Sequence, residues 1–134
     1  GLMVMFLVFA DNTARDGALR LWWVPTLLSS IAISLQVMAF APELHWYVGF
    51  SGVLHTLIVV ALFRCRVNWP PINWWLLVVA LVSKLIYEAG FGALPGSAET
   101  AGGPVAVQEH IAGAVFGLLY GVLWSLIAYV ADRT

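Results

Sequence analysis

The chain has 134 residues, of which 62% are hydrophobic and 10% are charged, with a formal net charge of −1 and a mean hydropathy of +0.93. Soluble domains carry about 25% charged residues. This composition therefore excludes a soluble globular protein and predicts an integral membrane protein with a single domain, residues 1–134. There is no basic patch that would favour nucleic acid as a partner, and one cysteine excludes an internal disulfide.

Five apolar segments follow one another along the chain, and together they predict an all-α membrane bundle. Residues 2–10 cover about half the length of a membrane span, and we expect them to be the second part of a helix. Residues 19–40, 73–91 and 108–130 each predict a full span. Residues 51–63 predict a shorter helix between the first two of these spans.

The short segment begins with a serine flanked by glycines, in the run Gly49-Phe50-Ser51-Gly52. From Ser51 to Phe63 the helix would be about 20 Å long at the helical rise, whereas a bilayer core is about 30 Å thick. Ser51 is therefore expected below the membrane surface, where a polar group is a functional candidate. A serine at a helix start is also typical of an N-cap.

The arginines predict the orientation in the membrane. Alternate crossings place all five on one side: Arg15, Arg20, Arg64, Arg66 and Arg133. The connections 41–50 and 92–107 contain no Lys or Arg. By the positive-inside rule the arginine side, with the C-terminus, is cytoplasmic. The Ser51 end then faces outward, which is the periplasm for a protein of the bacterial inner membrane.

The last segment carries a histidine and glycines on one stripe. Gly113, Gly117 and Gly121 are spaced by four and lie close to the face of His110, so a neighbouring helix can approach them closely. His110 is at the outward end, as is Ser51. A serine hydroxyl needs a base within about 3 Å to take its proton, so the two residues form a nucleophile and base in outline. His110 alone would equally fit a hydrogen-bonded core histidine.

Two charged residues lie inside the 73–91 span. Lys84 and Glu88 are four residues apart, and unpaired charges in a membrane span are costly. One interpretation is an internal salt bridge that allows the helix to insert. The other is a role in substrate passage or gating.

The two motifs resemble the rhomboid intramembrane serine proteases. Their signature is Gly-x-Ser-Gly at the start of a short submerged helix, followed by His-x-x-Gly-x-x-x-Gly in the last core helix. These patterns are present here as residues 49–52 and 110–117. Most rhomboids have an aromatic residue four positions after the serine, where this chain has His55. With Lys84 and Glu88, that histidine resembles the rhombosortase branch, whose expected substrates are bacterial proteins with a C-terminal Gly-Gly-type membrane anchor.

The resemblance implies that Ser51 is the nucleophile and that His110 is the general base and then the acid, in a dyad without a carboxylate. His55 is expected to support His110 by stacking on it; the alternative is that His55 itself is the base. Backbone groups at Gly49, Phe50 and Ser51 would provide part of the oxyanion hole.

The resemblance also implies roles for other parts of the chain. Gly52, Gly113 and Gly117 would support the site by helix packing. The 73–91 helix would border the route by which a transmembrane substrate enters, and the 92–107 loop would cover the site. The family core has six spans, of which we expect about four and a half here. The His-x-x-x-Asn segment that helps to hold the oxyanion is not in the sequence. The chain alone is therefore expected to be inactive or poor, because one lost oxyanion donor costs about 10²–10³ in rate.

Other functions are less well supported by the residues. His45, His55 and His110 are three possible metal ligands, but no His/Glu spacing on one helix supports a metal site, and no nucleotide motif is present. We therefore expect neither a metal nor a cofactor. The alternatives are a catalytically silent relative that binds membrane helices, and a small transporter or packing subunit. Retention of both Ser51 and His110 argues against the silent relative.

Overall fold

The computed structural model describes residues 18–40, 50–66, 69–96, 107–131 and 133. These residues form four helices, α2 (Ala18–Phe40), α3 (Phe50–Cys65), α4 (Pro71–Phe91) and α6 (Val107–Ala131). Each begins and ends within two residues of a predicted segment, so the predicted all-α bundle is confirmed. The expected half-span at residues 2–10 lies outside the described residues, as do the connection 41–49 and residues 97–106 of the expected cover.

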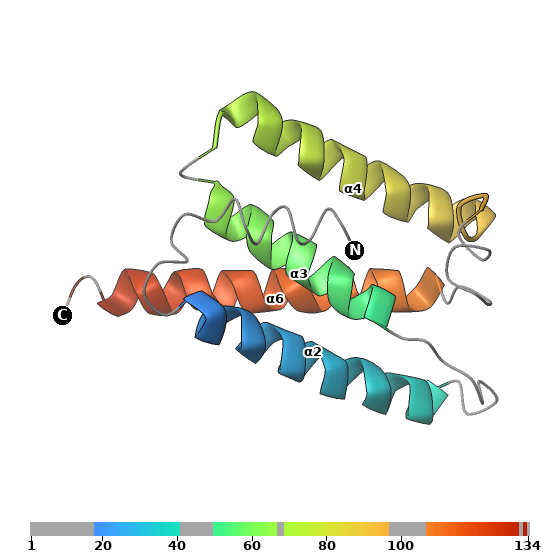
Figure 1. Cartoon of the computed structure of the whole chain (residues 1–134), viewed down its shortest axis with the longest axis horizontal. Coiled ribbons are helices and arrows are strands. Elements are labelled where there is room, and N and C mark those ends of the chain that lie inside the picture. Colours follow the sequence, from blue (N-terminus) through green and yellow to red (C-terminus); the bar gives the residue numbers. More distant parts are fainter. Residues whose placement is uncertain (1–17, 41–49, 67–68, 97–106, 132, 134) are drawn as a thin grey trace.

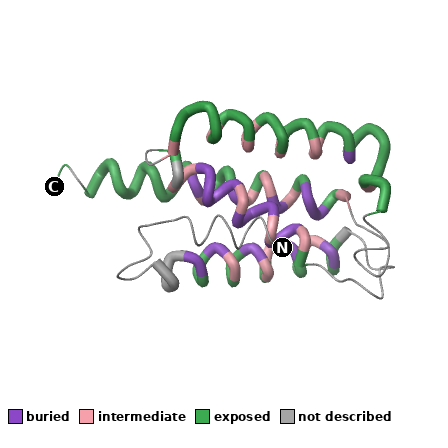
Figure 2. Tube along the Cα trace, turned by 45° about the horizontal axis from the view of Figure 1, so that its top comes forward, coloured by how far each residue is buried: buried purple, intermediate pink, exposed green. Residues whose placement is uncertain are grey.

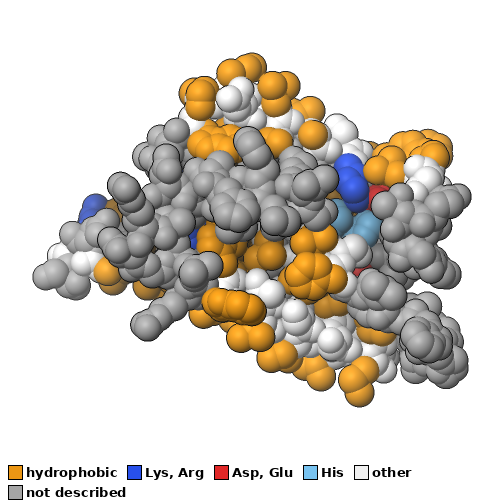
Figure 3. Space-filling view, viewed as in Figure 1, with side chains coloured by type: hydrophobic (Ala, Val, Ile, Leu, Met, Phe, Trp, Pro, Cys, Tyr) orange, Lys and Arg blue, Asp and Glu red, His pale blue; other side chains and the backbone are white. Residues whose placement is uncertain are grey.

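Three of these helices are long and apolar enough to cross a membrane: α2, α4 and α6. Helix α3 has 16 residues, about 24 Å at the helical rise, which confirms that it is the short helix of the bundle. Hydrophobic side chains cover the outer surfaces of α4 and α2 (Figure 3). Apolar outer faces of this kind suit lipid contact, and the chain is a multi-pass membrane protein.

Helix α3 lies at the centre of the bundle. It runs between α2 and α4 and crosses α6 (Figure 1), and most of its length is buried while α4 is largely exposed (Figure 2). Its core residues include Val53, Val60 and Ala61, all 3% exposed or less. Because α3 is covered by protein on several sides, a polar group can lie inside the membrane there without contact with lipid.

Glycines allow α3 and α6 to touch along their backbones. A Cβ on Gly113 would overlap the carbonyl oxygen of Gly52, and one on Gly117 would lie 2.7 Å from the carbonyl oxygen of Thr56. The Thr56 hydroxyl donates a hydrogen bond across the interface to the Gly113 carbonyl at 2.8 Å. The predicted close contact along the glycine stripe is therefore confirmed, and it brings the first turn of α3 against the first turns of α6.

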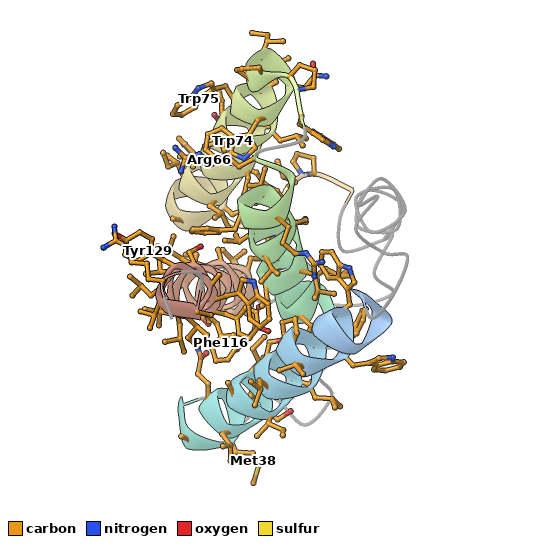
Figure 4. The ribbon with its side chains drawn as sticks, turned by 90° about the vertical axis from the view of Figure 1, so that its left-hand side faces the viewer. Met38, Arg66, Trp74, Trp75, Phe116 and Tyr129 are labelled. Atoms are coloured by element: carbon orange, nitrogen blue, oxygen red, sulfur yellow. The ribbon has the colours of Figure 1, made fainter. Side chains whose placement is uncertain are left out.

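Arginines and aromatic rings gather at the other end of the bundle. Arg64 lies 5.1 Å from the ring centre of Trp22, and Arg66 lies 5.9 Å from that of Trp74. Figure 4 shows Arg66 beside Trp74 where α3 gives way to α4. The start of α2, the end of α3, the start of α4 and the C-terminus all lie at this end (Figure 1). Ser51 and His110 are at the opposite end.

Helix α4 touches the rest of the bundle mainly near its two ends. At the arginine end, Trp74 Nε1 donates a hydrogen bond of 2.8 Å to the Leu62 carbonyl on α3. Between the ends, a cavity of about 340 Å³ separates α4 from α3 and α6, and its lining is chiefly apolar. At the end opposite the arginines α4 buries Glu88, the only residue of this helix that is buried. Polar contacts therefore fix this helix at both ends, through Trp74 at the arginine end and through Glu88 at the opposite end.

Candidate active site

Two histidines lie flat against each other at the end of the bundle opposite the arginines. His110 is the fourth residue of α6, and His55 is one turn after Ser51 on α3. Their ring centres are 4.3 Å apart and their planes differ by 21°. Both residues are buried, at 6% exposure or less. The predicted stacking of His55 on His110 is thus present in the structure.

Helix α4 brings a carboxylate to this pair. Glu88 accepts a hydrogen bond of 2.8 Å from His110 Nδ1, and the Lys84 ammonium lies 2.6 Å from the same carboxylate oxygen. The expected salt bridge within the helix is present. The expectation that no carboxylate contacts His110 is wrong, because the rotation of α4 about its axis turns Glu88 toward α6. Helix α4 ends one turn later, where Gly92 with φ +85° donates its N–H to the Glu88 carbonyl.

The partners of His55 determine where its proton lies. Lys84 Nζ is 3.0 Å from His55 Nε2, and an ammonium can only donate. Nε2 is therefore the acceptor and Nδ1 carries the proton, which His55 donates to the Ser51 carbonyl at 2.7 Å. This pattern assigns the Nδ1-protonated tautomer to His55. It also shows that His55 is hydrogen-bonded to the backbone of Ser51, the candidate nucleophile.

The same reasoning applies to His110. An ionised carboxylate only accepts, so the 2.8 Å contact with Glu88 places the proton on Nδ1 of His110. Lys84 is also 3.4 Å from that nitrogen, but two donors do not bond and the distance is long for a hydrogen bond. The other ring nitrogen, Nε2, is then the one that can accept a proton.

Ser51 lies in the first turn of α3 and is half-buried. The next residue, Gly52, packs against α6 so closely that a Cβ there would lie 2.7 Å from the carbonyl oxygen of Glu109. Gly52, which follows Ser51, is thus in contact with Glu109, which precedes His110. Among the described residues no hydrogen bond joins the Ser51 hydroxyl to His110. Catalytic hydrogen bonds are often long in the absence of substrate and shorten when it binds.

The remaining predicted site residues lie around this turn. Phe50, the first residue of α3, is 54% exposed. Gly49 lies outside the described residues. The first N–H groups of a helix have no partner within it, and together with the helix dipole they favour a negative charge. The first turn of α3 can therefore stabilise an oxyanion that forms next to Ser51.

Three side chains also fit the donor set of a metal ion. The ligand atoms of His55, Glu88 and His110 all lie within 4.8 Å of one another. No metal site is expected from the sequence, and the possible ligands named there include His45, which lies outside the described residues, but not Glu88. Lys84 Nζ is within 3.0 Å of both the Glu88 carboxylate and His55, so the Lys84 ammonium already occupies the position that a metal ion would take. These residues fit a metal only when Lys84 moves away.

Charged and imidazole groups are visible together at the surface of this end of the bundle, beside α4 and bordered by hydrophobic side chains (Figure 3). The contacts described above join four side chains from three helices: His55 on α3, Lys84 and Glu88 on α4, and His110 on α6. We call these four residues the polar cluster. Such a cluster inside an apolar bundle is typical of a functional site.

Comparison with known proteins gives one clear finding. A family model described as the rhomboid domain matches residues 2–127, nearly the whole chain. The comparisons with curated proteins and with solved structures gave no match.

Proposed function

Because this chain belongs to the rhomboid family of intramembrane serine proteases, we propose that it hydrolyses peptide bonds of membrane proteins with Ser51 as nucleophile and His110 as base. One observation carries the proposal. Gly52, next to Ser51, is in backbone contact with Gly113, one turn from His110. A close approach of the two helices at this level supports a serine and an imidazole acting on the same substrate carbonyl.

The reaction follows from the protonation of the two side chains. The Ser51 hydroxyl loses its proton to His110 Nε2 as Oγ bonds to the carbonyl carbon of the substrate. The carbonyl oxygen becomes an anion, which the N–H groups at the start of α3 stabilise. The carbon–nitrogen bond then breaks and the proton passes from His110 to the leaving amine. Water releases the acyl group from Ser51 by the same steps in reverse order, which restores the free enzyme.

Other features support the proposed substrate class and the proposed side of the membrane on which cleavage occurs. The polar cluster lies at the end of the bundle opposite the arginines, so the positive-inside rule favours cleavage near the outward face, the periplasmic face of a bacterial inner membrane. His55, Lys84 and Glu88 favour the rhombosortase type within the family. Its substrates would be proteins held by a C-terminal membrane anchor of the Gly-Gly type.

Activity-based labelling of the complete natural protein in membranes tests the proposed nucleophile. A fluorophosphonate probe is expected to label the wild-type protein and the Ser125→Ala control, because Ser125 lies near the arginine end of α6 and donates a hydrogen bond to the Gly121 carbonyl in its own helix. The Ser51→Ala and His110→Ala variants are expected to show no labelling above background. Labelling of Ser51→Ala at the wild-type level would overturn the proposal.

A catalytically silent protein that binds membrane helices is the second candidate. The observation that favours it is that the Ser51 hydroxyl and His110 are not hydrogen-bonded in the described part of the chain. Its signature would be a complete wild-type protein that captures a transmembrane peptide in vesicles but neither reacts with the probe nor cleaves the peptide.

A further inference from the structure

Rhomboid catalysis as proposed above needs only a serine and a histidine, but the polar cluster contains a carboxylate in contact with that histidine. We propose that Glu88 is a positioning residue, which holds His110 in the tautomer and orientation needed to accept the Ser51 proton, with Lys84 as its fixed counter-charge. During catalysis, hydrogen bonds would then connect Ser51 to His110 and His110 to Glu88. This inference rests on the proposed function.

The contact between Glu88 and His110 is specific in its geometry. The 2.8 Å bond reaches Nδ1 of the ring, which leaves Nε2 for the hydroxyl. Glu88 is 2% exposed and His110 is 4% exposed, so water does not compete for either group. A buried carboxylate requires compensation, and Lys84 at 2.6 Å already supplies a positive charge. Insertion of α4 therefore does not require the contact with His110, and a role in orienting the ring explains it.

Lys84 connects the two partners of the His110 ring. Its ammonium bonds Glu88 and the Nε2 atom of His55, while His55 lies flat against His110. His110 is thus held at its edge by Glu88 and on its face by His55. Both partners are themselves fixed by Lys84. A histidine held on two sides loses little freedom when the proton is transferred.

The carboxylate also acts during the reaction. When His110 Nε2 takes the Ser51 proton, the ring becomes positively charged, and the adjacent negative charge of Glu88 stabilises it. Glu88 itself takes up no proton in this step. In serine hydrolases that have an acid in this position, loss of its charge with retention of its shape lowers the rate by about 10⁴. Lys84 also lies near the ring and opposes the new charge, so we expect a smaller effect here.

Kinetics of the complete natural protein on a fluorescent transmembrane substrate in vesicles test the inference. For Glu88→Gln we expect kcat to fall by about 10²–10³, the lower part of the range of about 10²–10⁴ for general acid–base assistance. We expect KM to stay within about twofold because substrate binding does not use the carboxylate. Glu88→Asp is expected to recover at least about tenfold of the lost rate, since a carboxylate is kept. The matched control is Tyr87→Phe, whose exposed ring contacts Phe91 rather than the polar cluster.

A second variant decides the outcome if Glu88→Gln does not fold with an unpaired Lys84. The double variant Lys84→Met/Glu88→Gln removes both charges and remains suited to a membrane span. It is expected to keep its thermal midpoint and to lose kcat to at least the same extent. A folded Glu88→Gln or double variant with wild-type kcat would overturn the role of Glu88. That result would leave the protease function intact as long as Ser51→Ala is inactive. An active Ser51→Ala would instead refute the function itself.

Discussion

His55 makes two kinds of contact that an aromatic residue in its place would not make together. Its ring stacks on His110, and its two nitrogens bond the Ser51 carbonyl and the Lys84 ammonium. Phenylalanine would keep the first contact and lose the second. A lost buried hydrogen bond costs about 1–2 kcal/mol, which corresponds to about 5–30-fold in rate if it is felt in the transition state.

We therefore expect His55→Phe to cleave a transmembrane substrate about 5–30-fold more slowly than the wild-type protein, and His55→Ala to be slower still because stacking is lost as well. The measurement is kcat in vesicles, with His45→Phe as the matched substitution of a histidine in the connection 41–49. A His55→Phe variant as slow as Ser51→Ala would indicate that His55, not His110, is the base.

Lys84 determines whether the polar cluster can bind a metal ion. Its ammonium lies between the three possible ligands, His55, Glu88 and His110. In Lys84→Met the positive charge is gone and the three ligand atoms remain. Two histidines and one carboxylate are a common zinc donor set. We expect micromolar Zn²⁺ to raise the thermal midpoint of Lys84→Met by several degrees, since a ligand that binds only the folded state stabilises it. The wild-type midpoint is expected to stay unchanged.

A chelator should reverse the zinc effect, and the double variant Lys84→Met/His55→Gln should not show it. An equal rise of the midpoint in the wild-type protein would mean that Lys84 does not exclude a cation, and that the cluster is a metal site in its native form.

At the scale of the helices, the contact between α3 and α6 sets the height of Ser51 relative to His110. Gly113→Ala would place a methyl group against the carbonyl oxygen of Gly52, where backbone rather than a flexible side chain would have to move. Overpacking of this kind costs about 1–3 kcal/mol. We expect a lower thermal midpoint and a loss of cleavage, because the two helices separate at the level of the site.

Gly90→Ala on α4 is the matched control, since nothing lies within 4 Å of a Cβ at that position. Alanine also favours a helix by about 1 kcal/mol over glycine, so this variant should be as stable as the wild-type protein or slightly more so, with normal activity. Wild-type behaviour of Gly113→Ala would show that the two helices have room to adjust and that the glycine contact does not position the site.

Helix α4 illustrates what could and could not be predicted from sequence. Hydropathy predicted its end at Phe91 and its start to within two residues, and the salt bridge between Lys84 and Glu88 was one of two interpretations of their spacing of four. The contact of Glu88 with His110 did not, because it depends on how α4 is rotated against α6, which only packing decides. The sequence did contain an indication of this contact, because charged residues buried in a membrane span usually pair with polar residues at the same depth. His55 and His110 were the polar residues available there.

The whole molecule has an arginine end and an end that carries the polar cluster, and this division predicts which end faces outward. Arg64, Arg66 and Arg133 each contact an aromatic ring at one end, as expected for anchors at a membrane interface. The polar cluster lies at the other end, near the last turn of α4. Single cysteines introduced at Leu94 and at Arg133, in a protein with Cys65 replaced by serine, report the two ends separately.

In bacterial spheroplasts, whose inner membrane is intact, a membrane-impermeant maleimide is expected to label Leu94→Cys. Arg133→Cys is expected to stay unlabelled until the spheroplasts are lysed. The Cys65→Ser parent is the control without a thiol. Labelling of Arg133→Cys alone before lysis would indicate the opposite orientation, with the polar cluster on the cytoplasmic side. Cleavage would then act on cytoplasmic segments of its substrates, and an anchor of the Gly-Gly type would no longer be accessible from the periplasm. Because the arginines lie at one end and the polar cluster at the other, the membrane orientation fixes on which side a protein can be released.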